Sequence, residues 1–277
     1  MVDSPELTRV SELLDQLLGP EQASTTLNRL LRSDEPIAGI VRDVVASPTL
    51  ERLYKKVRTL GIQSGARKEA DPAMVGIPDL DAGLTFDEQF ARFFEPLLKV
   101  RAEGFATIFR SLPGPPHKLL MIETGCMRIP GNWAGDGQST FMFDALARER
   151  DGHLFSIDVT TESIETARRA CSSATHLLLG DSVATLHALG ALIKRPADLL
   201  YLDSYDLDPR DPMPSAIHHA MELIAAQPLV GPNTIVCVDD YSVGATTGGK
   251  GLVLDQYFSR IRARVLYSGY QKVWQLT

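Results

Sequence analysis

The sequence is short of several features that would assign it to a common protein class. It has three cysteines, Cys126, Cys171 and Cys237, and no CxxC pair. This argues against a zinc site or a disulfide framework and fits a reducing cytosol, so we expect a cytoplasmic protein. No apolar run reaches the roughly 18 residues of a transmembrane helix. The first residues also lack the charged start and apolar core of a signal peptide.

Basic residues are few as well. Lys and Arg total 28 against 35 for Asp and Glu, which gives a net charge of −7. Because nucleic-acid-binding proteins usually carry a basic face, this balance argues against DNA or RNA as the main partner. The GxGxxG fingerprint of dinucleotide-binding folds is also absent, which disfavours a nicotinamide oxidoreductase.

What is present suits a globular α/β protein with an accessory segment. The chain has 277 residues, of which 44% are hydrophobic. Residues 1–84 are expected to form a helical segment followed by a linker, because apolar residues recur there at helical spacing. The first stripe consists of Leu7, Val10, Leu13, Leu14, Leu17 and Leu18. Such a segment either packs as a plain helical bundle, covers a substrate site, or joins two copies into a homo-oligomer.

Residues 85–277 show a different pattern. A long helix is predicted from about Phe86 to Leu112, where Pro113-Gly114-Pro115-Pro116 ends it. Short apolar runs then alternate with helical stretches. The predicted strands are Lys118–Glu123, His153–Val159, His176–Leu179, Asp198–Leu202, Thr234–Val238, Arg264–Tyr267 and Val273–Leu276. Five βα units followed by a hairpin-length turn predict a doubly wound, seven-stranded, mostly parallel sheet with one antiparallel strand.

An acidic residue follows or ends each of the first five predicted strands. These residues are Glu123, Asp158, Asp181, Asp203 and Asp239, and Asp240 follows the last. One such aspartate is often only a turn or cap residue, but five of five are harder to explain in that way. Ligands of doubly wound sheets bind beyond the carboxyl ends of the strands, so the sequence predicts an acidic binding site there.

The loop after the first strand contains Gly125, Gly135 and Gly137, which permit close approach of backbone to a ligand. Ser139 or Thr140 is placed to cap the next helix. Glu123 would repel a pyrophosphate and suits a cationic ligand better. Asp158 can accept hydrogen bonds from ribose hydroxyls, a device that several nucleotide-binding folds share. Asp181 and Ser182 follow the third strand, where they could contact a ligand. It is equally plausible that one of them is the N-cap of the next helix.

Asp203, Asp239 and Asp240 give the most specific indication of a binding site in the sequence. The strands that they end are neighbours in the predicted sheet, so the three carboxylates are expected to converge. Carboxylates without nearby cysteine fit a hard cation, Mg²⁺ above all, and a cation would offset their mutual repulsion. The alternative is that Asp239 faces solvent and Asp240 caps a turn.

The segments Glu123-Thr-Gly, Asp158, Asp203-Ser-Tyr-Asp206 and Asp239-Asp240-Tyr241 resemble those of class I S-adenosylmethionine (SAM) dependent methyltransferases. Among these, the resemblance is to metal-dependent O-methyltransferases of the catechol, macrocin and novobiocin types, over residues 118–277. It implies metal ligands at Asp203, Asp239 and Asp240, and a general base at Asp206 or at nearby Asp208. The implied SAM-binding residues are Glu123, Thr124, Gly125, Gly135, Gly137, Ser139, Thr140, Asp158, Asp181, Ser182 and Asp203. About ten extra residues between Gly125 and Gly135 depart from the family pattern.

The resemblance therefore implies Mg²⁺-assisted methylation of a hydroxyl on a small molecule or sugar, in natural-product or glycan synthesis. Two alternatives stay open, namely methylation of an amine and a non-catalytic SAM-fold protein that binds a partner. His218 and His219 are expected to be ordinary surface or partly buried histidines. Lys250 is expected to be solvated, in a flexible glycine-rich loop over residues 244–251.

Overall fold

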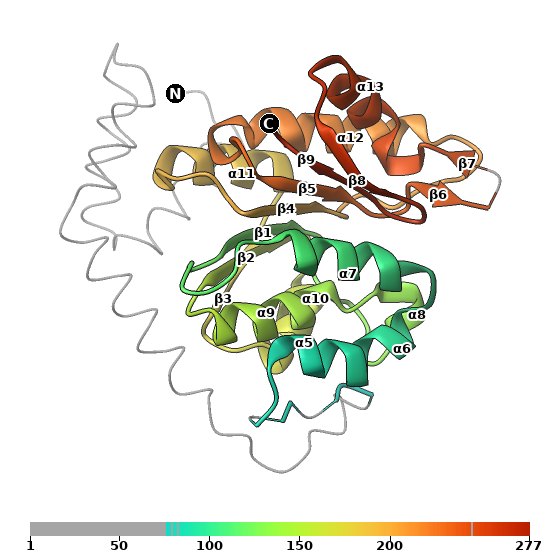
Figure 1. Cartoon of the computed structure of the whole chain (residues 1–277). Helices are drawn as coiled ribbons and strands as arrows, with labels where there is room; N and C mark the ends of the chain where they lie inside the picture. The colour runs from blue at the N-terminus through green and yellow to red at the C-terminus, as the bar shows by residue number, and fades with distance from the viewer. Residues whose placement is uncertain (1–75, 79, 82, 245) are drawn as a thin grey trace, which may run out of the picture. The chain divides into compact units, whose positions relative to one another are not determined.

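The computed structural model describes residues 76–78, 80–81, 83–244 and 246–277 (Figure 1). Most of the helical segment and linker predicted over residues 1–84, including the stripe that begins at Leu7, lies outside this part of the chain. No helix of the described residues is long and apolar enough to cross a bilayer.

A seven-stranded sheet organises the described chain. The five parallel strands are β1 (Leu120–Thr124), β2 (His153–Asp158), β3 (Thr175–Leu179), β4 (Leu199–Leu202) and β5 (Ile235–Val238). β8 (Arg264–Ser268) and β9 (Lys272–Gln275) form a hairpin, and β9 pairs antiparallel with β5. The strand order is β3-β2-β1-β4-β5-β9-β8, with β1 and β4 parallel neighbours at the centre. This confirms the predicted fold class, a doubly wound, Rossmann-like, mostly parallel sheet of seven strands with one antiparallel strand.

Helices cover both faces of the sheet (Figure 1). One face carries α7 (Ala102–Ser111), α9 (Ser139–Glu149) and α10 (Thr161–Ala170), whose buried side chains share a core with Met121 and Tyr201. The other carries α11 (Ser182–Leu192), α12 (Met213–Ala225) and α13 (Leu252–Arg260), which pack on Ile122 and Leu200. Because the central strands are buried on both faces, they read as continuous apolar runs in the sequence.

The helix predicted over 86–112 is interrupted in the structure. It consists of α5 (Phe86–Gln89), the π-helical η2 (Phe90–Phe94), α6 (Glu95–Leu98), η3 (Lys99–Arg101) and α7. Lys99 has a φ of +54°, outside the helical range, so the chain turns there before α7 begins. The turn places Arg101 beside the carboxyl end of β5.

Short elements fill the loops at that end of the sheet. α8 (Trp133–Asp136) lies within the long loop after β1, and η4 (Gln227–Leu229) follows α12. The described part of the loop over 244–251 contributes to a small hairpin of β6 (Ser242–Val243) with β7 (Thr246–Thr247) and then to η5 (Gly249–Gly251). η5 packs against α12.

Candidate active site

A small polar cavity lies where the order of the parallel strands reverses, between β1 and β4. Its lining comes from the ends of three strands and the loop after β1, and consists of Gly125, Cys126, Arg128, Asp136, Ser139, Asp158, Asp203 and Ser204. Its volume of about 30 Å³ corresponds to a single water molecule. The reversal point is the position at which doubly wound sheets bind their ligands.

Gly125 lets the β1 loop pass close to β4. Its φ is +87°, and a Cβ there would lie 2.6 Å from the carbonyl oxygen of Asp203. No side chain fits such a position without moving backbone, so glycine is required. Gly125 N donates a hydrogen bond to the carbonyl of Ile157 (2.8 Å), which ties the same loop to β2.

Asp158, at the end of β2, is fixed beside this loop. Its Oδ2 accepts a hydrogen bond from the backbone amide of Cys126 (2.9 Å), and its Oδ1 accepts from the amide of Thr160 (2.7 Å). The carboxylate lines the cavity and stays partly exposed. It therefore keeps acceptor capacity for a ligand hydroxyl.

Glu123 lies behind the lining of the cavity, although the sequence predicted that it would contact the ligand directly. It is fully buried, and its carboxylate accepts hydrogen bonds from the hydroxyls of Ser139 (2.5 Å), Thr140 (2.7 Å) and Ser156 (2.5 Å). Burial raises the pKa of Glu123 to about 7, although the three hydroxyl donors oppose that rise. Glu123 is not part of the cavity lining, but Ser139 is, so it acts on the cavity through Ser139.

The other residues assigned to SAM by resemblance are distributed around this centre. Thr124 and Thr140 are buried behind the lining, Gly135 is exposed within α8, and Gly137 packs against Arg101. Asp181 caps α11 by accepting from Ala184 N (2.8 Å), as its cap interpretation predicts. Among the residues with that assignment, those in the cavity lining are Gly125, Ser139, Asp158 and Asp203.

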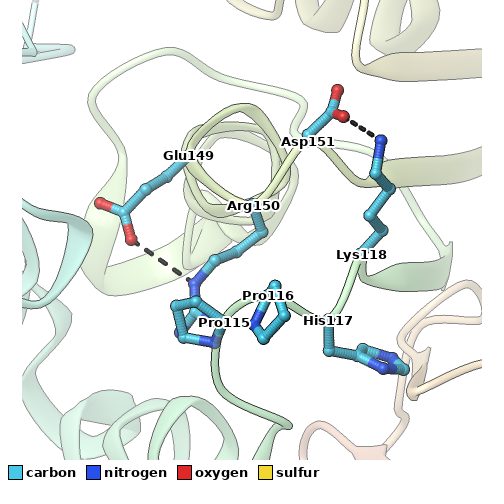
Figure 2. Close-up of a pocket in the computed structure, with 7 residues that line it drawn as sticks. All are labelled: Pro115, Pro116, His117, Lys118, Glu149, Arg150 and Asp151. Atoms are coloured by element: carbon cyan, nitrogen blue, oxygen red, sulfur yellow. Dashed lines mark hydrogen bonds and ion pairs between the residues drawn. The ribbon is translucent and has the colours of Figure 1, made fainter.

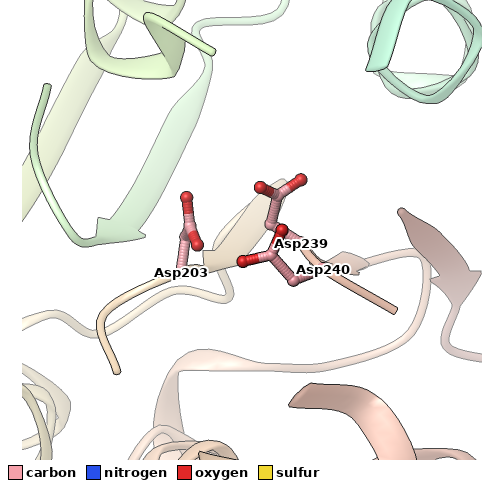
Figure 3. A group of neighbouring side chains, drawn as sticks. All are labelled: Asp203, Asp239 and Asp240. Atoms are coloured by element: carbon pink, nitrogen blue, oxygen red, sulfur yellow. The ribbon is translucent and has the colours of Figure 1, made fainter. Parts of the chain in front are cut away.

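Asp203, Asp239 and Asp240 converge as the sequence predicted (Figure 3). One ligand oxygen from each lies within 4.8 Å of the others. Asp239 is buried, whereas Asp203 and Asp240 are partly exposed. The interpretation in which Asp239 faces solvent is therefore wrong.

Two cations of the chain itself already hold this cluster together. Lys250, from η5, is buried and contacts Asp203 Oδ1 and Asp240 Oδ2, the latter at 3.0 Å. Arg101 donates from Nε to Asp239 Oδ2 (2.9 Å), and its guanidinium lies over the Tyr270 ring at 4.5 Å. These cations offset two of the three formal negative charges. The repulsion between the three carboxylates, which the sequence predicted, is therefore largely balanced by Lys250 and Arg101.

Burial raises the pKa of Asp203 and of Asp239, against the opposing effect of Lys250 and Arg101. Burial also acts to raise the pKa of Asp240, but Lys250 and a hydrogen bond from Tyr270 outweigh it and lower that pKa. The cluster therefore contains carboxyl groups of different proton affinity in one place, which is typical of functional sites.

Lys250 and Arg101 are the principal site residues that sequence reasoning missed. The expectation of a solvated Lys250 is wrong, because Lys250 is 1% exposed. A usable signal was the run Gly249-Lys250-Gly251: a Cβ on Gly249 would lie 1.9 Å from the carbonyl oxygen of Asp240. Such close backbone approach requires glycine, and Lys250 is the next residue along the chain.

The two predicted general bases occupy different surroundings. Asp206 is exposed and pairs with Arg128 (3.1 Å), which lines the cavity. Asp208 pairs with Arg210 (2.9 Å) in its own turn. Asp206 is thus connected to the cavity through one side chain, whereas Asp208 pairs with Arg210, which does not line the cavity.

A larger cavity of about 200 Å³ lies at the opposite end of the sheet, before β1 and β2 (Figure 2). Its lining includes Pro116, Lys118 and Arg150, and Lys118 pairs there with Asp151. None of the strand-end carboxylates described above reaches it. The smaller cavity is therefore the candidate site, because it joins the acidic cluster and the strand reversal.

No protein-family model matches this sequence, and no curated protein sequence matches it. Among solved structures, MycE methyltransferase from the mycinamycin biosynthetic pathway, in complex with Mg and SAH, is similar with a TM-score of 0.48 and 15% identity. That match covers 69% of this chain and 54% of MycE, so the chain spans about half of MycE.

Two further solved structures show the same kind of likeness. CalS11, a TDP-rhamnose 3'-O-methyltransferase of calicheamicin biosynthesis, has a TM-score of 0.45 and 15% identity, over 99% of this chain and 96% of that chain. The O-methyltransferase NovP has a TM-score of 0.39 and 17% identity, over 66% of this chain and 80% of that chain. At these identities the likeness concerns the fold alone.

Proposed function

We propose that this protein is a SAM-dependent O-methyltransferase that acts on a hydroxyl group of a small molecule or sugar. The observation that carries the proposal is the polar cavity at the strand reversal, where Gly125, Asp158 and Asp203 come together from the ends of β1, β2 and β4. A close glycine loop beside a carboxylate at the end of β2 suits a nucleoside with free ribose hydroxyls. The carboxylates also favour a sulfonium cation over a pyrophosphate.

The donor set of Asp203, Asp239 and Asp240 fits Mg²⁺, because three carboxylate oxygens can approach one point and no softer ligand joins them. When bound there, the metal would supply positive charge that lowers the pKa of a substrate hydroxyl. Lys250 contacts two of these three carboxylates, so Mg²⁺ and the ammonium group compete for the same oxygens.

Asp206 is the better of the two candidates for general base. Its ion pair with Arg128 places it at the edge of the cavity, and its exposure lets it reach a bound acceptor and pass a proton to water. In the proposed reaction Asp206 removes the proton of the acceptor hydroxyl, and the resulting oxygen nucleophile attacks the sulfonium methyl in line. SAH is the product.

The test incubates the full chain with methyl-labelled SAM, Mg²⁺ and a set of sugars and small alcohols, with matched amines as a second set. We expect transfer to hydroxyls and loss of transfer in EDTA, while calorimetry still detects SAH binding. Full turnover in EDTA would contradict the metal part of the proposal. Transfer only to amines, or SAH binding without any transfer, would replace it by amine methylation or a non-catalytic role.

The variant Lys250→Met tests the metal part of the proposal more directly. The variant removes the competing ammonium and leaves three carboxylates, so Mg²⁺ should bind it more tightly than the wild type. We expect about a tenfold or larger gain in Mg²⁺ affinity by calorimetry, as for a charged contact of at least about 1.4 kcal/mol. Asp239→Asn should remove that gain, and an unchanged affinity in Lys250→Met would exclude a metal on these carboxylates.

A further inference from the structure

Behind the cavity lies a buried polar cluster that the proposed reaction does not use. Glu222 and His219, both on α12, are completely buried. Glu222 Oε1 accepts a hydrogen bond from Ser204 Oγ (2.6 Å), and Ser204 lines the cavity. His218, half-buried on the same helix, places its Nε2 3.5 Å from Glu222 Oε1 and 3.1 Å from Ser182 Oγ.

The direction of the hydrogen bond between Ser204 and Glu222 is fixed by chemistry. An ionised carboxylate can only accept, so the single hydroxyl proton of Ser204 points away from the cavity, toward α12. Ser204 Oγ then presents only lone pairs to whatever binds in the cavity. Burial acts to raise the pKa of Glu222, but the neighbouring His218 and the hydrogen bond from Ser204 help to outweigh it, so that pKa is lowered.

This buried cluster is expected to destabilise the fold, because two of its polar atoms have no hydrogen-bond partner among the described residues. Glu222 Oε2 and His219 Nε2 lie 3.9 Å apart, and neither has a hydrogen-bond partner among the described residues. His219 Nδ1 donates to the carbonyl of Ser215 (2.7 Å), so the neutral ring turns an acceptor toward another acceptor. Buried unpaired polar atoms cost stability, which favours a functional reason for the carboxylate at this position.

We propose that Glu222 is a positioning residue that holds Ser204 as a hydrogen-bond acceptor toward the cavity, and thereby selects a ligand group that donates a proton there. The cavity lining carries three carboxylates against one guanidinium, so the donor that suits it is a cationic ammonium group. This inference rests on the proposed function, in which the ammonium belongs to the methionine portion of SAM.

Three variants separate this role from a purely structural one. Glu222→Met removes the acceptor at similar volume and frees the Ser204 hydroxyl to turn. Glu222→Gln keeps an amide oxygen that accepts from Ser204 and adds an N–H that can donate to His219 Nε2. Ser204→Ala removes the group through which Glu222 is proposed to act.

The experiment measures binding of S-adenosylhomocysteine, and of its analogue without the amino group, to the full chain by calorimetry. We expect Glu222→Met to weaken S-adenosylhomocysteine binding about 3- to 10-fold, as for one hydrogen bond. Glu222→Gln should restore most of the affinity. Ser204→Ala should weaken binding as much as Glu222→Met does, and adding Glu222→Met to Ser204→Ala should cost nothing further. The analogue should bind all five proteins alike.

Additive losses in the double variant, or an equal loss in Glu222→Gln and Glu222→Met, would overturn the positioning role. If the variants differ from the wild type in their affinity for the analogue without the amino group, the assignment of an ammonium group to this position would be overturned. If Glu222→Met fails to fold, Ser204→Ala carries the test, because a Ser204→Ala protein that binds S-adenosylhomocysteine as tightly as the wild type would overturn the proposal. Absence of S-adenosylhomocysteine binding by the wild type would instead contradict the proposed function.

Discussion

At the scale of single residues, Glu123 shows how burial changes what a carboxylate does. It is held by three hydroxyls in a fully buried place, and burial raises its pKa to about 7. A carboxyl group with a raised folded-state pKa contributes stability that is fully present below its unfolded pKa, near 4.5. That contribution is lost as the pH rises through about 7.

Glu123→Gln tests this linkage because glutamine does not titrate. From pH 5 to pH 8 the wild type should lose roughly 2–3 kcal/mol of unfolding free energy relative to the variant, since 1 pKa unit corresponds to about 1.4 kcal/mol. Urea unfolding of both proteins at the two pH values measures the difference. A variant-to-wild-type difference that stays constant with pH would show that Glu123 is charged throughout this range.

The acidic residues of the site were predictable one by one, whereas their cationic partners carried at most a weak signal, the two glycines that flank Lys250. Asp203 and Asp239 end neighbouring parallel strands, and parallel strands bring their carboxyl ends to one edge of the sheet. Lys250 and Arg101 reach the same point from η5 and η3 with long side chains. Their positions depend on tertiary packing, which leaves no periodic signal in the sequence.

At the scale of elements, the seven strands of the main sheet were predicted to within one or two residues, whereas the small strands β6 and β7 and the interruption of the helix before β1 were not. The predicted strand His153–Val159 is β2 (His153–Asp158), because buried parallel strands are distinct apolar runs. The break at Lys99, where φ is +54°, has no comparable marker, since lysine is an ordinary helix former. This break determines where Arg101 lies.

The crossing of the β1 loop over β4 gives an element-scale prediction. Gly125→Ala should lower the unfolding free energy by at least about 1–3 kcal/mol and weaken SAH binding, because its Cβ would meet the Asp203 carbonyl at 2.6 Å with φ at +87°. Gly114→Ala is the matched control, since nothing lies within 4 Å of a Cβ there. Chemical unfolding and calorimetry check both variants, and equal behaviour of the two would contradict the steric argument.

At the scale of the whole molecule, each end of the sheet has a cavity that is a candidate binding site. The larger cavity adjoins the amino ends of β1 and β2, whereas the smaller one holds the strand-end carboxylates. A cavity of about 30 Å³ has to open for a nucleoside to enter. Arg128 pairs with Asp136 (3.2 Å) and with Asp206 at that cavity.

Ligand-linked stability of the full chain decides between the two ends. SAH at 100 times its Kd should raise the unfolding free energy by about 2.7 kcal/mol, because it binds only the folded state. Asp158→Asn removes a charged acceptor from the strand-reversal cavity and should cut that stabilisation by about 1.4 kcal/mol or more at the same SAH concentration. Lys118→Gln, in the larger cavity, should keep it. The reverse pattern in thermal and urea unfolding would place the nucleoside at the amino ends of the strands, and the proposed active site would then be wrong.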